Sequence, residues 1–278
     1  MMGVAELRRT LEARGLAPRK SLGQNFLIDG NLIDKLIDAS GAEAGDLVLE
    51  IGPGAGALTE RLLDRGLEVI ACELDNGLAD LVADRFDSYS EQFRLIRGDC
   101  LASKREMNPA IVEAIGERPY RLIANLPYGA ATPLIMTLLL QHHQCESLWV
   151  TIQKEVADRL LASPGGRDYG ELSIVAQSIA SVQRIASVPP SCFWPAPKVV
   201  SAMVGLVRRD APLSADPVEL QLLARRLFMR RRKQLQSILK GELTAATWPP
   251  DVDPTARPES LSIEQLESLR IAMAAGDG

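Results

Sequence analysis

The sequence predicts an α/β fold, in which short parallel strands alternate with helices. The first sign is the segment 47–58, LVLEIGPGAGAL, where the apolar run Leu47–Ile51 is followed directly by glycines at three alternate positions. Apolar residues return at helical spacing from Leu58 onward, so the segment indicates a buried strand, a tight turn and a helix. The second sign is that three more apolar runs follow, each leading into a polar residue.

Two glycines of this turn, Gly52 and Gly54, are expected to offer bare backbone to a ligand. Glycine takes positive φ at no steric cost, and it has no Cβ to block a cofactor. The spacing G-x-G-x-G differs from the G-x-G-x-x-G that cradles a pyrophosphate at a helix N-terminus. The loop therefore favours a cofactor without phosphates.

Carboxylates stand at the ends of the next two apolar runs. The run Glu68–Cys72 leads into Glu73, and Phe93–Arg97 leads into Gly98–Asp99. A carboxylate at the first position can accept hydrogen bonds from both hydroxyls of a ribose, and Asp99 can accept one from an exocyclic adenine amine. Each of these carboxylates alone could equally be a residue that caps the end of a strand. Together with the glycine loop they suit the nucleoside half of S-adenosylmethionine.

The fourth run, Tyr120–Ala124, leads into Asn125, Leu126, Pro127 and Tyr128, which we take as the chemical centre. Proline removes one N–H and biases Leu126 to extended geometry, so nearby carbonyls stay free. The Asn125 Oδ1 and the Leu126 carbonyl can accept from both N–H groups of an adenine N6 amine, and Tyr128 can stack on the base. The alternative is a strand that ends at a proline and has its tyrosine in the core. That alternative is less consistent with this segment, because it follows the fourth strand of a chain that carries a glycine loop after its first.

A proline-rich segment, Val188–Lys198, carries a further aromatic candidate, Phe193. Four prolines exclude a helix or the interior of a sheet, so we expect this segment over or beside the carboxyl edge of the sheet. Phe193 is a candidate to close the other face of the target base. A loop aromatic tucked into the core is the competing interpretation, and the pattern alone does not decide between them.

Composition limits the class of protein. Of the 278 residues 46% are hydrophobic, enough for a large core in one or two domains. No stretch has the apolar length of a membrane span, and the N-terminus carries charges where a signal peptide needs an apolar core, so we expect a cytoplasmic protein. Four widely spaced cysteines indicate reduced thiols. Two adjacent histidines, His142 and His143, argue against a metal site and against Ser/His/Asp chemistry.

Basic residues are unevenly placed although the net charge is −5. One cluster, near the N-terminus, comprises Arg8, Arg9, Arg14, Arg19 and Lys20. A second lies on a run with helical apolar spacing and comprises Arg225, Arg226, Arg230, Arg231, Arg232 and Lys233. A solvated helix face is the usual explanation of such a run. Six cations with no intervening acid favour an anionic partner, and we take the second cluster as an RNA-binding surface.

The remaining pattern indicates further helices and a domain boundary. From Arg208 the composition changes to a linker, so we expect domains at 1–210 and 211–278. Ser262 and Gln265 have the spacing of a capping box. We expect no strand in Ala102–Arg118. Expected strands are Ser147–Ile152 and Val199–Val207, and expected helices are Thr132–Leu140, Gln153–Ala162, Glu171–Ala180, Val218–Leu243 and Ser262–Ala274.

Taken together, the motifs resemble the bacterial ribosomal RNA adenine dimethyltransferase family, and they run in order through nearly the whole chain. They are SLGQNFL at 21–27, LEIGPGAGALT at 49–59, Glu73, Gly98–Asp99, NLPY at 125–128, QKEVADRL at 153–160, YGELS at 169–173, VPPSCFWPAPKVVSA at 188–202 and LFMRRRKQL at 227–235. The resemblance implies a Rossmann-like seven-stranded methyltransferase sheet and a small helical C-terminal domain. It also implies two methyl groups on N6 of each of two adjacent adenosines near the 3′ end of small-subunit ribosomal RNA, on an immature 30S particle.

Carried over by motif, the resemblance implies S-adenosylmethionine as the cofactor. Its contacts would be Asn25, Leu27, Gly52, Glu73, Asp99 and Asn125, the last shared with the target base. The chain departs from the family after NLPY, where Gly129–Ala130–Ala131 replace an asparagine and a β-branched residue. The wall beside the target adenine is therefore expected to be wider or more mobile.

Two other classes of protein remain as alternatives. One is an RNA-binding assembly factor on a methyltransferase fold whose catalysis is dispensable or lost. The intact Glu73, Asp99 and NLPY argue against lost activity. The other is a nicotinamide-dependent dehydrogenase, which the glycine spacing and the lack of a Tyr-x-x-x-Lys pair disfavour. The leading expectation is a monomeric RNA methyltransferase that needs no metal.

Overall fold

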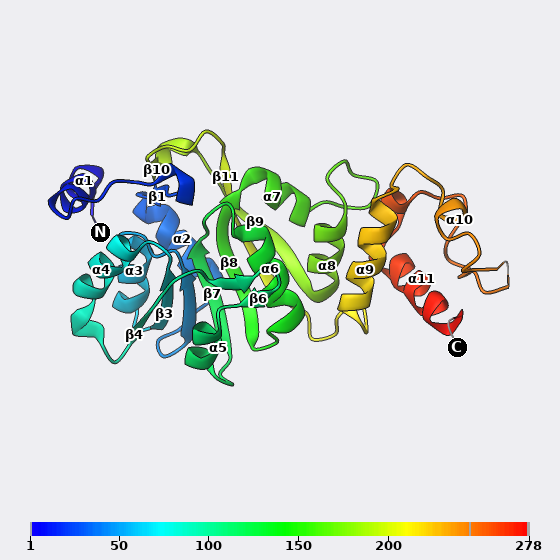
Figure 1. The fold of residues 1–278 in the computed structure, drawn as a ribbon, viewed down its shortest axis with the longest axis horizontal. Helices are drawn as coiled ribbons and strands as arrows, with labels where there is room; N and C mark the ends of the chain where they lie inside the picture. Colours follow the sequence, from blue (N-terminus) through cyan, green and yellow to red (C-terminus); the bar gives the residue numbers. More distant parts are fainter. Residues whose placement is uncertain (1, 245, 277–278) are drawn as a thin grey trace. The chain divides into compact units, whose positions relative to one another are not determined.

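A computed structural model describes residues 2–244 and 246–276 (Figure 1). The chain forms two compact units. The first comprises Met1–Ala157 and Gln183–Val207, and the second comprises Asp158–Val182 and Arg208–Gly278. The predicted boundary at 210 lies close to one of these breaks. The prediction of 1–210 as one domain differs from the structure, because residues 158–182 pack with the C-terminal helices.

The first unit contains a seven-stranded sheet in the order β4-β3-β2-β7-β8-β11-β9. Neighbours from β4 to β8 are parallel, and β11 runs antiparallel to β8. This confirms the predicted seven-stranded α/β sheet. The strands are β2 (Leu47–Ile51), β3 (Glu68–Glu73), β4 (Phe93–Arg97), β7 (Tyr120–Asn125), β8 (Cys145–Gln153), β9 (Ala180–Val188) and β11 (Ser201–Arg208).

Helices cover this sheet (Figure 1). Val48 and Val69 pack in one apolar cluster with residues of α2, α3 and α4, whereas Leu49 and Ile70, which point to the opposite face, are also buried. Both faces of these strands are therefore covered, as a parallel sheet requires. The helices of the unit are α1 (Val4–Ala13), α2 (Gly30–Ser40), α3 (Ala57–Asp64), α4 (Asn76–Arg85), α5 (Pro109–Ile115) and α6 (Ala131–Gln141).

Two small antiparallel pairs complete the first unit. β1 (Phe26–Leu27) pairs with β10 (Phe193–Trp194), and β5 (Leu101–Ser103) pairs with β6 (Glu106–Met107). The expectation that 102–118 holds no strand is therefore wrong. Asn108 explains the hairpin, because its side chain donates to the Asp99 carbonyl at 2.7 Å and also caps α5.

The second unit is helical. It contains α8 (Glu171–Ile179), α9 (Pro217–Phe228), α10 (Leu235–Ile238) and α11 (Ile263–Gly276), and α7 (Lys154–Leu160) runs into it from the first unit. Its core joins Ile174, Leu220 and Leu266. The capping box is confirmed, because the Ser262 N–H donates to Gln265 Oε1 at 3.0 Å and the Gln265 N–H donates to Ser262 Oγ at 3.2 Å.

The predicted single helix Val218–Leu243 is wrong. Helix α9 ends at Phe228, and a turn separates it from the short α10. After the turn the backbone bonds to a neighbouring loop, since the N–H groups of Leu235 and Gln236 donate to the carbonyls of Ala256 and Pro254, both at 2.9 Å. These contacts replace the continuation of the helix.

A close approach in the sheet allows a stability test. Gly205 in β11 lies opposite Trp149 in β8, and a Cβ added to it would lie 2.4 Å from the indole ring. The ring cannot move freely, because Trp149 Nε1 donates to Ser147 Oγ at 2.9 Å. We expect Gly205→Ala to lower the free energy of unfolding by about 1–3 kcal/mol, measured by chemical denaturation. Gly129→Ala is the matched control, because nothing lies within 4 Å of its Cβ position. Equal stability of the two variants would contradict this packing.

Candidate active site

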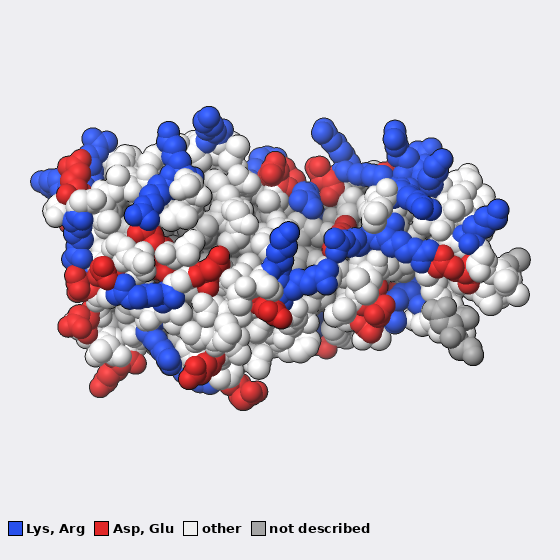
Figure 2. Space-filling view, viewed as in Figure 1, with Lys and Arg blue, Asp and Glu red and all other residues white. Residues whose placement is uncertain are grey.

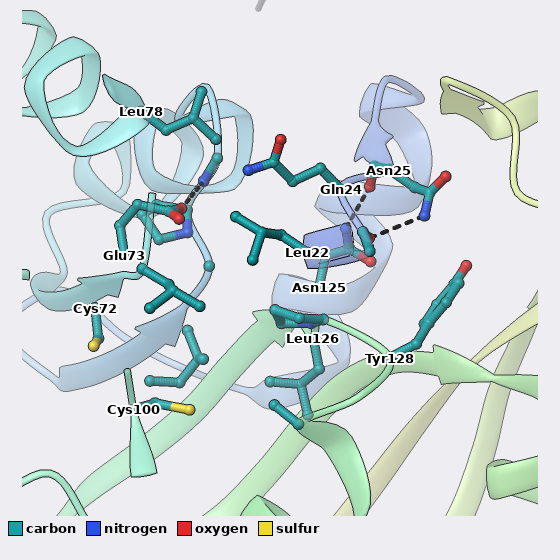
Figure 3. A pocket seen from close by; sticks show the side chains of 18 of the residues that line it. Leu22, Gln24, Asn25, Cys72, Glu73, Leu78, Cys100, Asn125, Leu126 and Tyr128 are labelled. Carbon is teal, nitrogen blue, oxygen red and sulfur yellow. Dashed lines mark hydrogen bonds between the residues drawn. The ribbon is translucent and has the colours of Figure 1, made fainter. Parts of the chain in front are cut away.

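A cavity of about 710 Å³ opens where β2, β3, β4 and β7 end (Figure 3). All parts of its lining come from the first unit. The parallel strands place their carboxyl ends at one edge of the sheet, so residues far apart in sequence meet there. Sequence-predicted residues in this lining are Asn25, Leu27, Gly52, Gly54, Glu73, Asp99, Asn125, Leu126, Pro127 and Tyr128.

The glycine loop needs its glycines. Gly52 and Gly54 have φ of 71° and 60°, the left-handed region that other residues rarely adopt. A Cβ on Gly54 would lie 2.9 Å from the Phe26 ring, and a Cβ on Gly52 would lie 3.1 Å from Pro127. Either substitution would therefore strain the backbone and push a neighbouring side chain into the cavity wall.

Glu73 is held firmly at the end of β3. Its side chain is 5% exposed, Oε2 accepts from the Gly54 N–H at 3.1 Å, and Oε1 accepts from the Asp75 N–H at 2.9 Å. Burial raises the pKa of this carboxyl, and the two backbone donors oppose that rise. Each oxygen can accept a second hydrogen bond, so the carboxylate can bind a ligand without releasing the loop.

Asp99 has a different environment. It is exposed at the end of β4, where Oδ1 accepts from the Leu101 N–H at 3.0 Å. Beside it, Cys72 and Cys100 are buried free thiols that line the cavity, and burial raises the pKa of both to about 12. These two side chains are therefore neutral surfaces of the cavity.

Asn125 carries the least satisfied polar atom of the site. Its Nδ2 donates to the Asn25 carbonyl at 3.1 Å, whereas its buried Oδ1 has no hydrogen-bond partner among the described residues. The Leu126 N–H donates to the Thr151 carbonyl at 3.1 Å. A buried acceptor without a donor costs free energy, so Asn125 Oδ1 is available to accept a hydrogen bond from a ligand.

Tyr128 lies on the side of the cavity away from Glu73, next to Asn25 and Asn125 (Figure 3). Its hydroxyl shares a hydrogen bond of 2.8 Å with Ser201 Oγ. Burial raises the pKa of Tyr128, while the bond to Ser201 opposes the rise. Ser201 was not predicted, because the contact joins residues 73 positions apart. The bond orients the ring.

The role of Phe193 as a wall of the base site is not supported. Its side chain is 3% exposed, packs in the core of the first unit and does not line the cavity. The reason is the pairing of β10 with β1, which places Phe193 opposite Leu27. The competing interpretation, an aromatic tucked into the core, describes this structure.

Glu50 is a cavity residue that the sequence reasoning missed. It is 2% exposed, lines the cavity and accepts from Thr59 Oγ1 at 2.7 Å. Burial, with the nearby charge of Glu73, raises its pKa to about 8. The sequence does contain a sign of this residue, because an acid within the otherwise apolar run Leu47–Ile51 is expected to be buried with the strand.

The second basic cluster lies in the other unit, where Lys and Arg gather at the end of α9 and beyond it (Figure 2). Only part of it forms a free surface. Arg226 is paired with Glu242, and Arg231 binds Glu259 at 2.8 Å and the Arg167 carbonyl at 3.2 Å. The predicted helix does not carry all six cations, because α9 ends at Phe228, and two of the six are paired with acids. Among the described residues, four cations of the cluster have no ion pair: Arg225, Arg230, Arg232 and Lys233.

Within the described ranges, 2–244 and 246–276, no three His, Cys, Asp or Glu residues are grouped so that they could hold a metal ion. No helix there has the length and apolar character needed to cross a membrane.

The sheet order, the glycine loop and the strand-end carboxylates define a methyltransferase of the Rossmann-like class. Two solved structures share the fold at 24% identity. A dimethyladenosine transferase from Plasmodium falciparum has a TM-score of 0.74 and covers 90% of this chain and 97% of that one. The 23S rRNA methyltransferase ErmE has a TM-score of 0.67, covering 90% of this chain and all of its own.

Sequence comparisons are more specific. The family profile described as ribosomal RNA adenine dimethylase matches residues 15–274. Relatives named ribosomal RNA small subunit methyltransferase A include one from Streptomyces avermitilis, 38% identical over 97% of this chain and 92% of its own, and one from Hahella chejuensis, 41% identical over 93% of each. The chain therefore belongs to the ribosomal RNA adenine dimethylase family.

The buried acid Glu50 generates a pH prediction. Its pKa is about 8 in the folded chain and 4.5 ordinarily, so the folded state holds the proton more tightly. The free energy of unfolding should then fall as the pH rises through this window, by at most about 1.4 kcal/mol per pH unit. Glu50→Gln keeps an acceptor for Thr59 but cannot ionise, so it should lose less stability. Urea denaturation between about pH 5 and about pH 8 measures this. The same pH dependence in both proteins would refute the assignment to Glu50.

Proposed function

We propose that this protein transfers methyl groups from S-adenosylmethionine to N6 of adenosines in small-subunit ribosomal RNA. Two adjacent adenosines near the 3′ end each receive two methyl groups, on an immature 30S particle in the cytoplasm, and the enzyme acts as a monomer. Family membership supports the reaction. The single structural observation behind the site assignment is the buried, unpartnered Oδ1 of Asn125 in the cavity wall.

The cavity suits the cofactor. Gly54 presents bare backbone at a point where a Cβ would already meet Phe26, Glu73 has acceptor positions for the ribose hydroxyls, and Asp99 can accept from the adenine amine. Asn25 and Leu27 complete the lining. When bound, S-adenosylmethionine supplies a methyl group activated by a sulfonium.

The residues of this chain position the amine. The N6 lone pair of adenine is delocalised into the ring, which makes the amine a poor nucleophile. Hydrogen bonds from its two N–H groups to Asn125 Oδ1 and the Leu126 carbonyl favour a pyramidal nitrogen with its lone pair directed at the methyl group. Tyr128, oriented by Ser201, stacks on the base. The proton becomes acidic as the new C–N bond forms and leaves to solvent, so no strong base is needed.

The segment after NLPY makes room for the second methyl group. Gly129 and Ala130 line the cavity, and nothing lies within 4 Å of the position that a Gly129 Cβ would take. A monomethylated amine is bulkier and keeps one N–H for the two acceptors. An open wall at this point supports dimethylation.

RNA docking is assigned to the second unit. Arg225, Arg230, Arg232 and Lys233 carry the phosphate contacts, because they are exposed and unpaired among the described residues. Arg226 and Arg231 form ion pairs with Glu242 and Glu259, so they hold the shape of this surface and do not contact phosphates.

Transfer of labelled methyl groups from S-adenosylmethionine to small-subunit particles from cells lacking this protein tests the proposal. Nucleoside analysis of the product should show N6,N6-dimethyladenosine. Cofactor binding and particle binding without transfer would instead support an assembly factor without catalysis.

Glu73→Ala tests the cofactor site. It removes an acceptor of two hydroxyl groups, so S-adenosylmethionine binding should weaken by roughly 1.5–3 kcal/mol, the range for hydrogen bonds to a charged group. Titration calorimetry measures the loss. Because the carboxylate also holds the Gly54 and Asp75 N–H groups, Glu73→Gln is the matched variant, which keeps shape and one acceptor oxygen. Unchanged affinity in both variants would remove Glu73 from the site.

Asn125→Ala tests the catalytic assignment. Loss of Oδ1 removes the positioning of the target amine, so the rate of methyl transfer should fall by orders of magnitude while particle affinity changes little. Single-turnover kinetics and particle binding are measured on the same preparation. Asn31→Ala, at an exposed position in α2, is the control. Equal losses of rate and of particle affinity would indicate a docking or folding role for Asn125.

A further inference from the structure

Thr151 in β8 carries a buried hydroxyl to which the proposed function gives no role. The residue is 0% exposed, and its Oγ1 has no hydrogen-bond partner among the described residues. Its side chain does not line the cavity, so it does not contact a ligand bound there. A buried hydroxyl without a partner costs free energy, because burial removes the hydrogen bonds that water would make. The capacity of this hydroxyl to donate a hydrogen bond is therefore unused.

Thr151 lies directly beside the proposed catalytic asparagine. β7 and β8 are parallel neighbours, and their register places Asn125 opposite Thr151. The Leu126 N–H donates to the Thr151 carbonyl at 3.1 Å, which holds this register at the site. Residues opposite one another point to the same face of a sheet, and neighbouring strands lie about 4.8 Å apart. The two side chains are therefore neighbours on one face.

The two unpartnered atoms are complementary. Asn125 Oδ1 is a carbonyl oxygen, which only accepts hydrogen bonds, whereas the Thr151 hydroxyl can donate one. On its other side Thr151 lies opposite Met203 of β11, whose thioether is a weak acceptor. Ser201, two residues before Met203, already shares its hydroxyl with Tyr128 at 2.8 Å. Of the side chains opposite Thr151, Asn125 therefore offers the stronger acceptor.

We infer that Thr151 is a positioning residue for methyl transfer, which donates a hydrogen bond to Asn125 Oδ1 when the cofactor is bound. No bond joins the two oxygens in this structure. Rotation about the Cα–Cβ bond of Thr151 moves its hydroxyl between staggered positions, so the bond can form without movement of the backbone.

This bond would fix the Asn125 amide at both ends. Nδ2 is already held by the Asn25 carbonyl at 3.1 Å, and Thr151 would hold Oδ1. Because a carbonyl oxygen has two lone pairs, Oδ1 keeps one for the N6 amine of the target adenosine. The inference rests on the proposed function and adds to it a residue outside the cavity.

Thr151→Val tests the inference, because valine has nearly the same shape and no hydroxyl. The kcat of methyl transfer to small-subunit particles should fall about three- to tenfold, as expected for one lost hydrogen bond, while the KM for S-adenosylmethionine and the particle affinity stay unchanged. Thr151→Ser keeps the hydroxyl and should retain most of the kcat. Thr137→Val is the matched control with wild-type kcat, since Thr137 in α6 is buried in the same unit and does not line the cavity.

A purely structural role for Thr151 predicts a different result. Removal of a hydroxyl that never finds a partner should raise the melting temperature of Thr151→Val and leave its kcat unchanged. An unchanged kcat, or an equal loss of kcat in Thr151→Val and Thr151→Ser, would overturn the inference.

A crystal structure of the wild type with S-adenosylhomocysteine gives a test that does not need activity. Thr151 Oγ1 should lie within about 3 Å of Asn125 Oδ1, and a separation above about 3.5 Å would also overturn the inference. If the wild type transfers no methyl groups to the particles, the proposed function fails, and this distance still decides whether Thr151 positions Asn125.

Discussion

The hydrogen bond from the Gly54 N–H to the buried Glu73 carboxylate ties the glycine loop to the end of the neighbouring strand. It forms because β2 and β3 are parallel and in register, with Ile51 opposite Cys72, so the two strands end side by side. The same sheet edge brings in the ends of β4 and β7. The order and register of the strands therefore determine where the residues that line the cavity lie.

This arrangement places two buried carboxyl groups at one cavity. Glu50 and Glu73 are both buried at the cavity, and the charge of Glu73 adds to the burial that raises the pKa of Glu50. Such a site favours a ligand that brings positive charge, because the ligand stabilises the ionised carboxylates. S-adenosylmethionine carries a sulfonium and an ammonium group.

The sequence predicted those elements that a short segment of chain identifies by itself. The apolar run before Gly52 marked β2, and acids following apolar runs marked Glu73 and Asp99, because strand ends in a parallel sheet share one edge. By contrast, β9 was missed, since it is the last strand of the sheet and many of its side chains are exposed. Edge strands lack the continuous apolar run that a buried strand shows.

Other features depended on contacts distant in sequence. Phe193 faces the core because β10 pairs with β1, a contact that no pattern in its own segment reveals. The end of α9 at Phe228 depends on bonds to the 254–256 loop, and the partner of Tyr128 is Ser201 on a distant strand. The cations of the second cluster were counted correctly from sequence, but ion pairs with Glu242 and Glu259 decide which of them are free.

We propose that the cavity at the ends of β2, β3, β4 and β7 is where two adjacent adenosines of small-subunit ribosomal RNA are dimethylated. Two methyl groups on N6 block base pairing, so reverse transcriptase stops at a dimethylated adenosine. Primer extension through the 3′ region of the small-subunit RNA tests this in cells that lack the protein and in cells to which it is restored. We expect stops at two adjacent adenosines only when the protein is present. Stops that persist without the protein, or that never appear when it is restored, would contradict it.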